Sequence, residues 1–240
     1  SPAMPASERE TSDSQPAAEP IYQGLLTAIM EHRLAAGTKL VEERLCEATG
    51  AGRPRIRQVL ARLAHEQLVT LVPNKGAFVA QPSVEEARDV FQTRRIIEPE
   101  LAAMLARACG PAQAKRLREH IAAEHAARER GDRAATIRLS GEYHVLIAEM
   151  AGNHVLERLI RETVSRTCLI ITLYDRPGLP ACPEHEHDTL TEAITAGDAA
   201  RAHDLMREVE GDLADRRIQR VGAGVVARGQ RRIAGLPGRE

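Results

Sequence analysis

The chain has 240 residues, enough for one large or two modest domains, and a net charge of −1 that on its own argues against a nucleic-acid-binding protein. Hydrophobic residues make up 43% of it, but aromatic residues only 2% and Trp is absent, which favours packed helices over a sheet sandwich. No apolar run approaches the roughly 20 residues needed to cross a bilayer, no signal peptide is visible, and four cysteines without CxxC spacing are typical of reduced thiols. We therefore expect a cytoplasmic protein that does not enter a membrane.

Four regions follow one another along the chain. Residues 1–19 are rich in Pro, Ala, Ser and Glu, lack periodicity, and are predicted to be a disordered arm. Residues 20–82 are expected to form one folded unit and residues 83–220 a second. The segment 221–240 is Gly-rich and basic, and we expect a flexible tail.

The unit over 20–82 is expected to combine helices with two short strands. Apolar residues at helical spacing open it, a short helix follows at about 42–49, and a third helix spans about 53–67. The runs LVTLV and AFVA are β-rich, and the turn Pro73-Asn74-Lys75-Gly76 joins them. This order predicts a three-helix core with a β wing.

The second unit is predicted to be entirely helical. Ser83, followed three residues later by Glu86, has the capping-box pattern that starts a helix. Helix breakers separate the predicted helices, which span 84–108, 111–130, 133–151, 154–174, 184–196 and 199–218. We expect an α-helical bundle here, so the fold class is mainly α.

Three arginines, Arg53, Arg55 and Arg57, open the third helix of the first unit. Between residues 50 and 82 there are five Arg or Lys residues and a single acid, Glu66, so this segment is basic although the whole chain is not. The first residues of a recognition helix meet base edges in the DNA major groove, and a basic loop can reach neighbouring phosphates. The pattern therefore favours DNA recognition over catalysis.

Two parts of the sequence resemble the parts of one protein family. Residues 40–80, LVEERLCEATGAGRPRIRQVLARLAHEQLVTLVPNKGAFVA, resemble the winged helix-turn-helix of the GntR family of bacterial transcriptional regulators. The segments TRRIIEPELA (93–102), EYHVLIAEMAGN (142–153) and EHDTLTEAITAGD (186–198) resemble the FadR-type effector domain, called FCD. The resemblance covers about 20–215. It implies a ligand-responsive regulator, most often a repressor, that binds a palindromic double-stranded DNA operator as a homodimer.

The resemblance also assigns the DNA contacts. The residues that would face the operator lie on the second and third helices and in the wing: Arg44, Arg53, Arg55, Arg57, Lys75 and Gly76. The family usually has Ser or Thr where this chain has Gly52, and its Pro54 stands one place earlier than usual. These departures suggest an altered operator preference and not a loss of DNA binding.

Many FCD domains hold a metal ion through an Asp and a His four residues apart and one His on each of two later helices. His144 and His187 match two of these positions, but Ser140 and Val209 stand at the other two. Such a ligand set would suit Zn²⁺ or Ni²⁺. With half of the set missing, hydrogen bonding of His144 and His187 to an anionic effector is the alternative, and a plain core or surface role is a third.

Arg94 and Glu98 also match the FCD pattern, on the first helix of that domain. Their i, i+4 spacing allows an ordinary intrahelical ion pair, and the alternative is that Arg94 points into the cavity to hold a ligand carboxylate. We accordingly expect a small organic acid as effector, near Arg94, His144 and His187, and no enzymatic activity. A metal-dependent enzyme and an effector-independent architectural DNA binder are the other functions to weigh.

Overall fold

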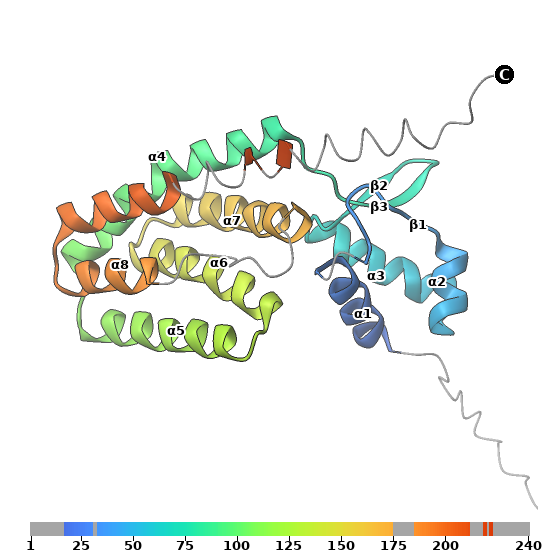
Figure 1. Cartoon of the computed structure of the whole chain (residues 1–240), viewed down its shortest axis with the longest axis horizontal. Coiled ribbons are helices and arrows are strands. Elements are labelled where there is room, and N and C mark those ends of the chain that lie inside the picture. The colour runs from blue at the N-terminus through green and yellow to red at the C-terminus, as the bar shows by residue number, and fades with distance from the viewer. Residues whose placement is uncertain (1–16, 31–32, 175–184, 212–217, 220, 223–240) are drawn as a thin grey trace, which may run out of the picture.

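The computed structural model describes residues 17–30, 33–174, 185–211, 218–219 and 221–222. Figure 1 shows two bodies side by side: helices α1 to α3 lie on one side of a small sheet in one, and helices α4 to α8 form a bundle in the other. The mainly helical fold predicted from the sequence is confirmed. Among the described residues, no helix is both long and apolar enough to span a membrane.

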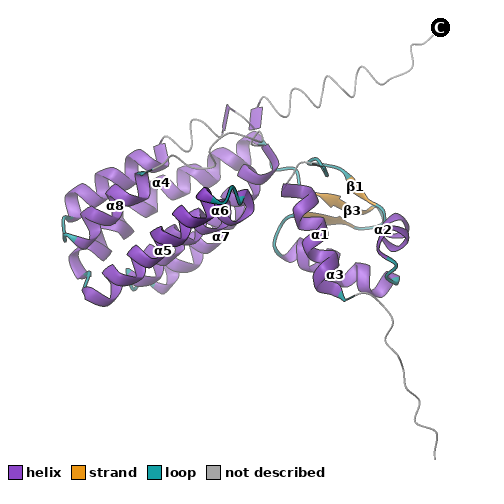
Figure 2. Ribbon diagram, turned by 60° about the horizontal axis from the view of Figure 1, so that its bottom comes forward, coloured by secondary structure: helices purple, strands orange, loops and turns teal. Residues whose placement is uncertain are grey.

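The first body has the predicted three helices and wing. Its helices are α1 (Ala18–Met30), α2 (Glu42–Thr49) and α3 (Arg53–His65), and its strands are β1 (Lys39–Leu40), β2 (Val69–Val72) and β3 (Gly76–Val79). The strands are antiparallel in the order β1-β3-β2, and Figure 2 shows β1 beside β3. The predicted turn joins β2 to β3, and it includes Asn74 and Gly76 at φ values of 61° and 98°. The sequence did not predict β1, because two residues are too short for an alternating pattern.

The start of α3 is built from small and constrained residues. Gly50 ends α2 in the left-handed conformation with φ of 71°, and its N–H donates to the carbonyl of Cys46. Gly52 then precedes α3 in an extended conformation, and Pro54 lies in the first turn of α3, where no intrahelical donor is needed. The turn therefore presents the first turn of α3 together with its arginines.

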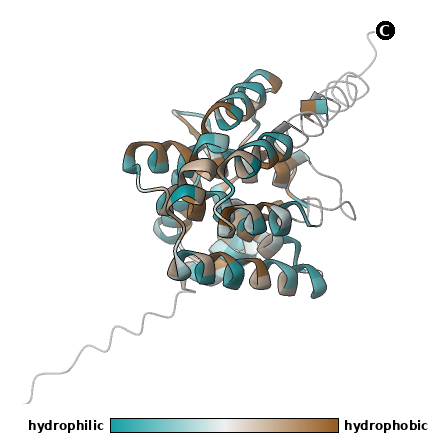
Figure 3. Cartoon of the chain, turned by 90° about the vertical axis from the view of Figure 1, so that its left-hand side faces the viewer, coloured by the Kyte–Doolittle hydropathy of each residue, from teal (hydrophilic) through white to brown (hydrophobic). Residues whose placement is uncertain are grey.

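The second body contains the predicted helices with small changes of their ends. They are α4 (Val84–Ala108), α5 (Pro111–Glu129), α6 (Arg133–Met150), α7 (His154–Tyr174) and α8 (Glu186–Thr195), followed by a helix over 199–211. The Ser83 hydroxyl accepts a hydrogen bond from the backbone N–H of Glu86 at 3.0 Å, as the capping pattern predicts. In Figure 3 hydrophobic and hydrophilic residues alternate along these helices, as expected for helices that bury one face.

Helix α7 belongs to both hydrophobic cores. Its N-terminal part, with Ile160 and Val164, packs into the core of the helical bundle. Its C-terminal residues Leu173 and Tyr174 pack into the core of the first body, and the Tyr174 hydroxyl donates to the Pro82 carbonyl at 2.8 Å. A single helix thus connects the interior of the bundle to the interior of the first body.

The predicted loose ends are shorter than expected where the structure describes them. Ala18 and Glu19 belong to α1, because the Glu19 carboxylate pairs with Arg62 at 2.6 Å and accepts a hydrogen bond from Gln23. Val221, assigned to the tail, is fully buried in the core of the first body. The rest of the arm, 1–16, and of the tail, 223–240, lies outside the described residues.

Candidate nucleic-acid interface and effector cavity

The arginines at the start of α3 lie on the surface. The side chains of Arg53 and Arg57 are 58% and 65% exposed, and each pairs with an acid of α2: Arg53 with Glu43 at 2.8 Å and Arg57 with Glu42 at 3.0 Å. The structure therefore places these arginines beside α2, which also carries the exposed Arg44. Such solvated pairs contribute little to stability, roughly 0–1 kcal/mol each, so the guanidinium groups remain available for a ligand.

The wing carries the other residues expected at DNA. Lys75 and Gly76 are exposed in the turn between β2 and β3. Lys39 lies next to them: its Nζ is 5.8 Å from the centre of the Phe78 ring on β3. The sequence analysis missed Lys39, because its place beside the wing depends on the unpredicted strand β1. Lys39 therefore adds a further positive charge to the surface that Lys75 and Gly76 form.

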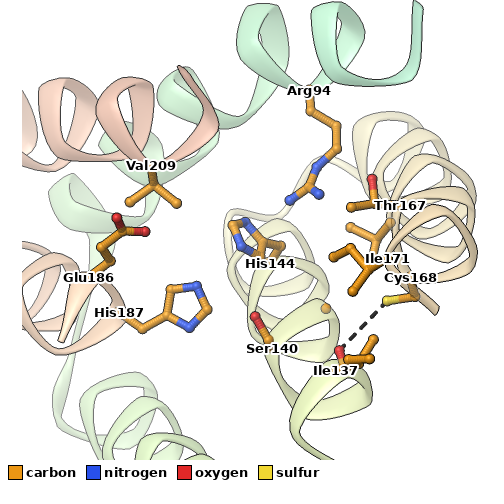
Figure 4. Close-up of a pocket in the computed structure, with 12 residues that line it drawn as sticks. Arg94, Ile137, Ser140, His144, Thr167, Cys168, Ile171, Glu186, His187 and Val209 are labelled. Carbon is orange, nitrogen blue, oxygen red and sulfur yellow. Dashed lines mark hydrogen bonds between the residues drawn. The ribbon is translucent and has the colours of Figure 1, made fainter. Parts of the chain in front are cut away.

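Residues from five helices line a small cavity inside the bundle. Arg94 enters it from α4, His144 from α6 and His187 from α8, as Figure 4 shows. Ser140 and Val209, at the two other positions of the expected metal site, line the same cavity. Its volume is about 20 Å³, which is room for about one water molecule and not for an organic acid. The sequence therefore identified the positions that meet here, although they lie far apart along the chain.

Arg94 is the centre of a buried charge cluster. The residue is 1% exposed, its Nε lies 2.5 Å from Glu98 Oε1, and its Nη2 lies 2.9 Å from Glu210 Oε1. His144 hydrogen-bonds through Nδ1 to the other oxygen of Glu98, and the same nitrogen is 3.5 Å from Glu210. The predicted pair between Arg94 and Glu98 exists, and Arg94 also lines the cavity, while its binding of a ligand carboxylate stays a prediction.

Burial and charge set different protonation states within this cluster. Burial opposes ionisation of Glu98, but the Arg94 guanidinium outweighs it and lowers the pKa of Glu98 to about 2. At Glu210 burial dominates and raises the pKa well above its usual range. Burial also lowers the pKa of His144 to about 4. Within one cluster, the Arg94 guanidinium thus favours the ionised form of Glu98, while burial disfavours the charged forms of Glu210 and His144.

A second buried glutamate holds the other histidine of the cavity. Glu124 of α5 is 3% exposed, and its Oε2 lies 2.9 Å from Nδ1 of His187. Burial opposes ionisation of Glu124, but hydrogen bonds from His120 and His187 lower its pKa to about 2. The Tyr143 ring stacks on His187 with centroids 4.2 Å apart. Both cavity histidines are thus fixed at Nδ1 by a buried carboxylate.

The donor set does not fit the divalent metal ion that the FCD resemblance implies. Glu98, His144 and Glu210 do offer ligand atoms within 4.8 Å of one another. Oε2 of Glu210 also has no hydrogen-bond partner among the residues that the structure describes. However, the Arg94 guanidinium already contacts both carboxylates, and a metal ion between them would lie beside a buried positive charge.

Two glutamates of this site were missed by the sequence analysis, and both carry a signal. Glu124 continues the helical spacing of the buried residues Leu117 and Ile121 along α5. Glu210 lies four residues after the buried Met206. An acid on the apolar stripe of a helix is rarely buried without a partner, and it therefore indicates a buried polar site.

The two bodies correspond to two known families of domains. The model of the family described as bacterial regulatory proteins, gntR family, matches residues 17–79, and the model of the FCD domain matches residues 89–210. The chain belongs to the GntR family. Its winged helix-turn-helix is the GntR domain, and the helical bundle is the FCD domain. Neither domain family is one of enzymes, so the alternative of a metal-dependent enzyme has no support.

Several GntR repressors are similar to this chain in sequence. GlaR of Escherichia coli K12 is 28% identical in an alignment that covers 78% of this chain and 89% of GlaR. NanR of Salmonella schwarzengrund is 28% identical in an alignment that covers 84% of this chain and 80% of NanR. RspR of Escherichia coli K12 is 25% identical over 144 residues, and there the chain spans only 63% of RspR.

Solved structures of GntR proteins share the fold. A transcriptional regulator GntR from Rhodococcus sp. RHA1 superposes with a TM-score of 0.66 at 19% identity, covering 84% of this chain and 97% of that protein. McbR/YncC of Escherichia coli gives a TM-score of 0.63 at 17% identity, with the same coverage of 84% and 97%. These likenesses confirm the combination of a winged helix-turn-helix with a helical bundle.

Proposed function

We propose that this GntR protein is a cytoplasmic, ligand-responsive repressor that binds a palindromic operator as a homodimer. The observation that carries the proposal is the exposed group of arginines on the first turns of α3, at the position from which a recognition helix reads the major groove. Its relatives RspR, GlaR and NanR are named repressors, which supports repression over activation.

The DNA surface is proposed to combine base readout by α3 with backbone contacts by its neighbours. Arg53 and Arg57 would exchange Glu43 and Glu42 for guanine edges, where a bidentate contact is worth roughly 1–3 kcal/mol of discrimination. The remaining contacts are assigned to the operator backbone and the adjacent minor groove, and they come from Arg44, Arg55, Lys75 and Gly76.

The effector is proposed to be a small organic acid that enters the FCD cavity near Arg94, His144 and His187. Because the cavity of about 20 Å³ is too small for it, the helix over 199–211 has to move first. Glu210 then releases Arg94, and the effector carboxylate takes its place as the partner of the guanidinium. The residues of α7 that line the cavity, Thr167 and Ile171, would transmit this movement along α7 into the GntR domain.

Exposed apolar side chains support a homodimer formed by the FCD domain. Ile96 on α4 is 70% exposed, and Val155 and Leu159 on α7 are 58% and 43% exposed. The helices α4 and α7 pack against each other, so these side chains lie on neighbouring elements. A second copy of the chain would cover them, and the two α3 helices of the dimer would then read the two halves of a palindrome.

The test is the loss of operator binding in Arg53→Ala. The wild-type protein first selects its operator from a pool of random duplexes, and fluorescence anisotropy then gives the affinity for that duplex. A dimer loses two arginines, each worth roughly 1–3 kcal/mol, so we expect the affinity of Arg53→Ala to fall by at least about 30-fold. Circular dichroism should show an unchanged fold, because the exposed pair with Glu43 contributes little to stability.

A matched control comes from the FCD domain. Arg116 on α5 is 51% exposed and pairs with Glu149 at 3.1 Å, so Arg116→Ala removes a similar exposed ion pair far from α3 along the chain. We expect Arg116→Ala to bind the operator like the wild type and to sediment as the same dimer. Wild-type operator affinity in Arg53→Ala would show that α3 does not read DNA in this protein.

A further inference from the structure

The FCD cavity is lined by a positively charged side chain. Arg94 is buried, and its guanidinium bridges Glu98 on its own helix and Glu210, 116 residues later in the chain. A buried guanidinium is stable only when its charge is paired and its donors are hydrogen-bonded, and the two carboxylates supply both. The bridge therefore links the helix over 199–211 to α4, with the Arg94 guanidinium between the two carboxylates.

Two of the four positions expected to hold a metal ion carry no ligand group. Ser140 and Val209 line the cavity but offer neither a carboxylate nor an imidazole. Glu210, the residue next to Val209, instead brings a carboxylate to Arg94. His144, the other side chain near Glu210, hydrogen-bonds through Nδ1 to Glu98. The cavity thus lacks two of the four expected ligands, and the acid at position 210 contacts a guanidinium.

We infer that the FCD cavity of this chain holds no divalent metal ion, and that the guanidinium of Arg94 is the cation that Glu98 and Glu210 share. The geometry agrees with this assignment, because the guanidinium already contacts both carboxylates, at 2.5 Å from Glu98 and 2.9 Å from Glu210. A divalent ion added to the same cluster would repel Arg94 across a few ångströms of low-dielectric interior. The inference refines the effector site proposed above, and its test uses neither DNA nor effector, so the two can fail separately.

The first measurement is the metal content of the untagged wild-type protein. After dialysis against buffer containing Zn²⁺ or Ni²⁺ and gel filtration, elemental analysis should find far less than one metal ion per chain. The melting temperature of the wild type should be unchanged by Zn²⁺, Ni²⁺ or EDTA, because only a ligand that binds the native state raises it. One tightly bound metal ion per chain, or a rise of the melting temperature with Zn²⁺, would overturn the inference.

The second measurement removes the guanidinium. In Arg94→Met the ligand atoms of Glu98, His144 and Glu210, which lie within 4.8 Å of one another, lose their resident cation. We expect this variant to melt at a lower temperature than the wild type, to regain several degrees with Zn²⁺, and to develop visible absorption with Co²⁺. Arg94→Lys keeps a positive charge and should show no response to either metal.

These results are decisive in both directions. A folded Arg94→Met protein that binds neither Zn²⁺ nor Co²⁺ would contradict the inference, because the cluster would then be no metal position at all. If Arg94→Met does not accumulate in soluble form, Arg94→Gln takes its place with the same expected metal response. The metal content of the wild type stands independently of how either variant folds.

Discussion

The charge of His144 makes the stability of the protein depend on pH. Burial lowers the pKa of this imidazole to about 4 in the folded protein, whereas an unfolded chain has a value near 6.5. As pH falls from about 6.5 to about 4, the unfolded state takes up a proton that the folded state does not, so the free energy of unfolding decreases. Between pH 7.5 and pH 5 we expect His144 to account for a loss of roughly 2 kcal/mol.

Urea unfolding of the wild type and of His144→Gln at these two pH values checks this expectation. The glutamine amide can still donate to Glu98, but it does not titrate, so the variant should lose less stability on acidification than the wild type. Glu98 and Glu124, whose pKa values are about 2, begin to contribute only below about pH 4.5, outside this window. Equal losses in the two proteins would mean that His144 is not buried as a neutral group.

At the scale of single residues, the sequence predicts which residues line a site better than which residues contact one another. Arg94, His144 and His187 could be assigned to one cavity because helical spacing and the family pattern place them. The partner of Arg94 could not be assigned, since Glu210 lies 116 residues away and the contact depends on how two helices pack. Such a contact has no signature in local sequence, beyond the presence of an acid on an apolar stripe.

At the scale of elements, the contact between α6 and α7 depends on a glycine. A Cβ atom on Gly141 would lie 2.7 Å from the Cys168 sulfur and 2.9 Å from Val164 Cγ1, both closer than carbon atoms normally approach. We expect Gly141→Ala to reduce the free energy of unfolding by roughly 1–3 kcal/mol, because α6 and α7 must separate slightly. Chemical denaturation measures this difference.

Gly24 in α1 is the matched control for this substitution. It is also within a helix, but a Cβ atom there would meet nothing within 4 Å. Gly24→Ala should therefore stabilise the protein by roughly 0.5–1 kcal/mol through the lower backbone entropy of the unfolded chain. If both substitutions changed stability in the same direction, α6 and α7 would not pack as closely as the structure shows.

The long helices could be predicted from the breakers that separate them, and the shortest strand could not. Each of α4 to α7 spans at least four turns, and Ser83, Gly110-Pro111, Gly131-Asp132 and Gly152-Asn153 mark where these helices begin. β1 has two residues and exists because β3 offers it an edge to pair with. Its formation is a tertiary effect, and Lys39 was missed with it.

At the scale of the whole molecule, the two domains should unfold together. Leu173 and Tyr174 of α7 are buried in the core of the GntR domain, while Ile160 of the same helix is buried in the FCD core. Loss of either core would expose part of the other, so we expect one cooperative calorimetric transition with equal calorimetric and van't Hoff enthalpies. Leu173→Ala should lower its midpoint without splitting it, since a buried Leu→Ala change costs about 2–5 kcal/mol.

Two separate transitions in calorimetry would contradict this expectation. In that case the FCD bundle would keep α7 while the GntR domain melts, and Leu173→Ala would shift only the transition of the GntR domain. The exposed Leu71 offers a comparison, because Leu71→Ala removes a side chain that belongs to neither core and should leave the shape of the transition unchanged.

The place of α7 also limits how the parts of this protein can be exchanged. A recombination at the linker near Pro82 would join this GntR domain to the α7 of a different protein, and the residues at the positions of Leu173 and Tyr174 would then be foreign to its core. A functional chimera needs both the N-terminal segment and the last turns of α7 from the same parent. The unit that evolution or an engineer can transplant is therefore discontinuous in the gene, although it is continuous in space.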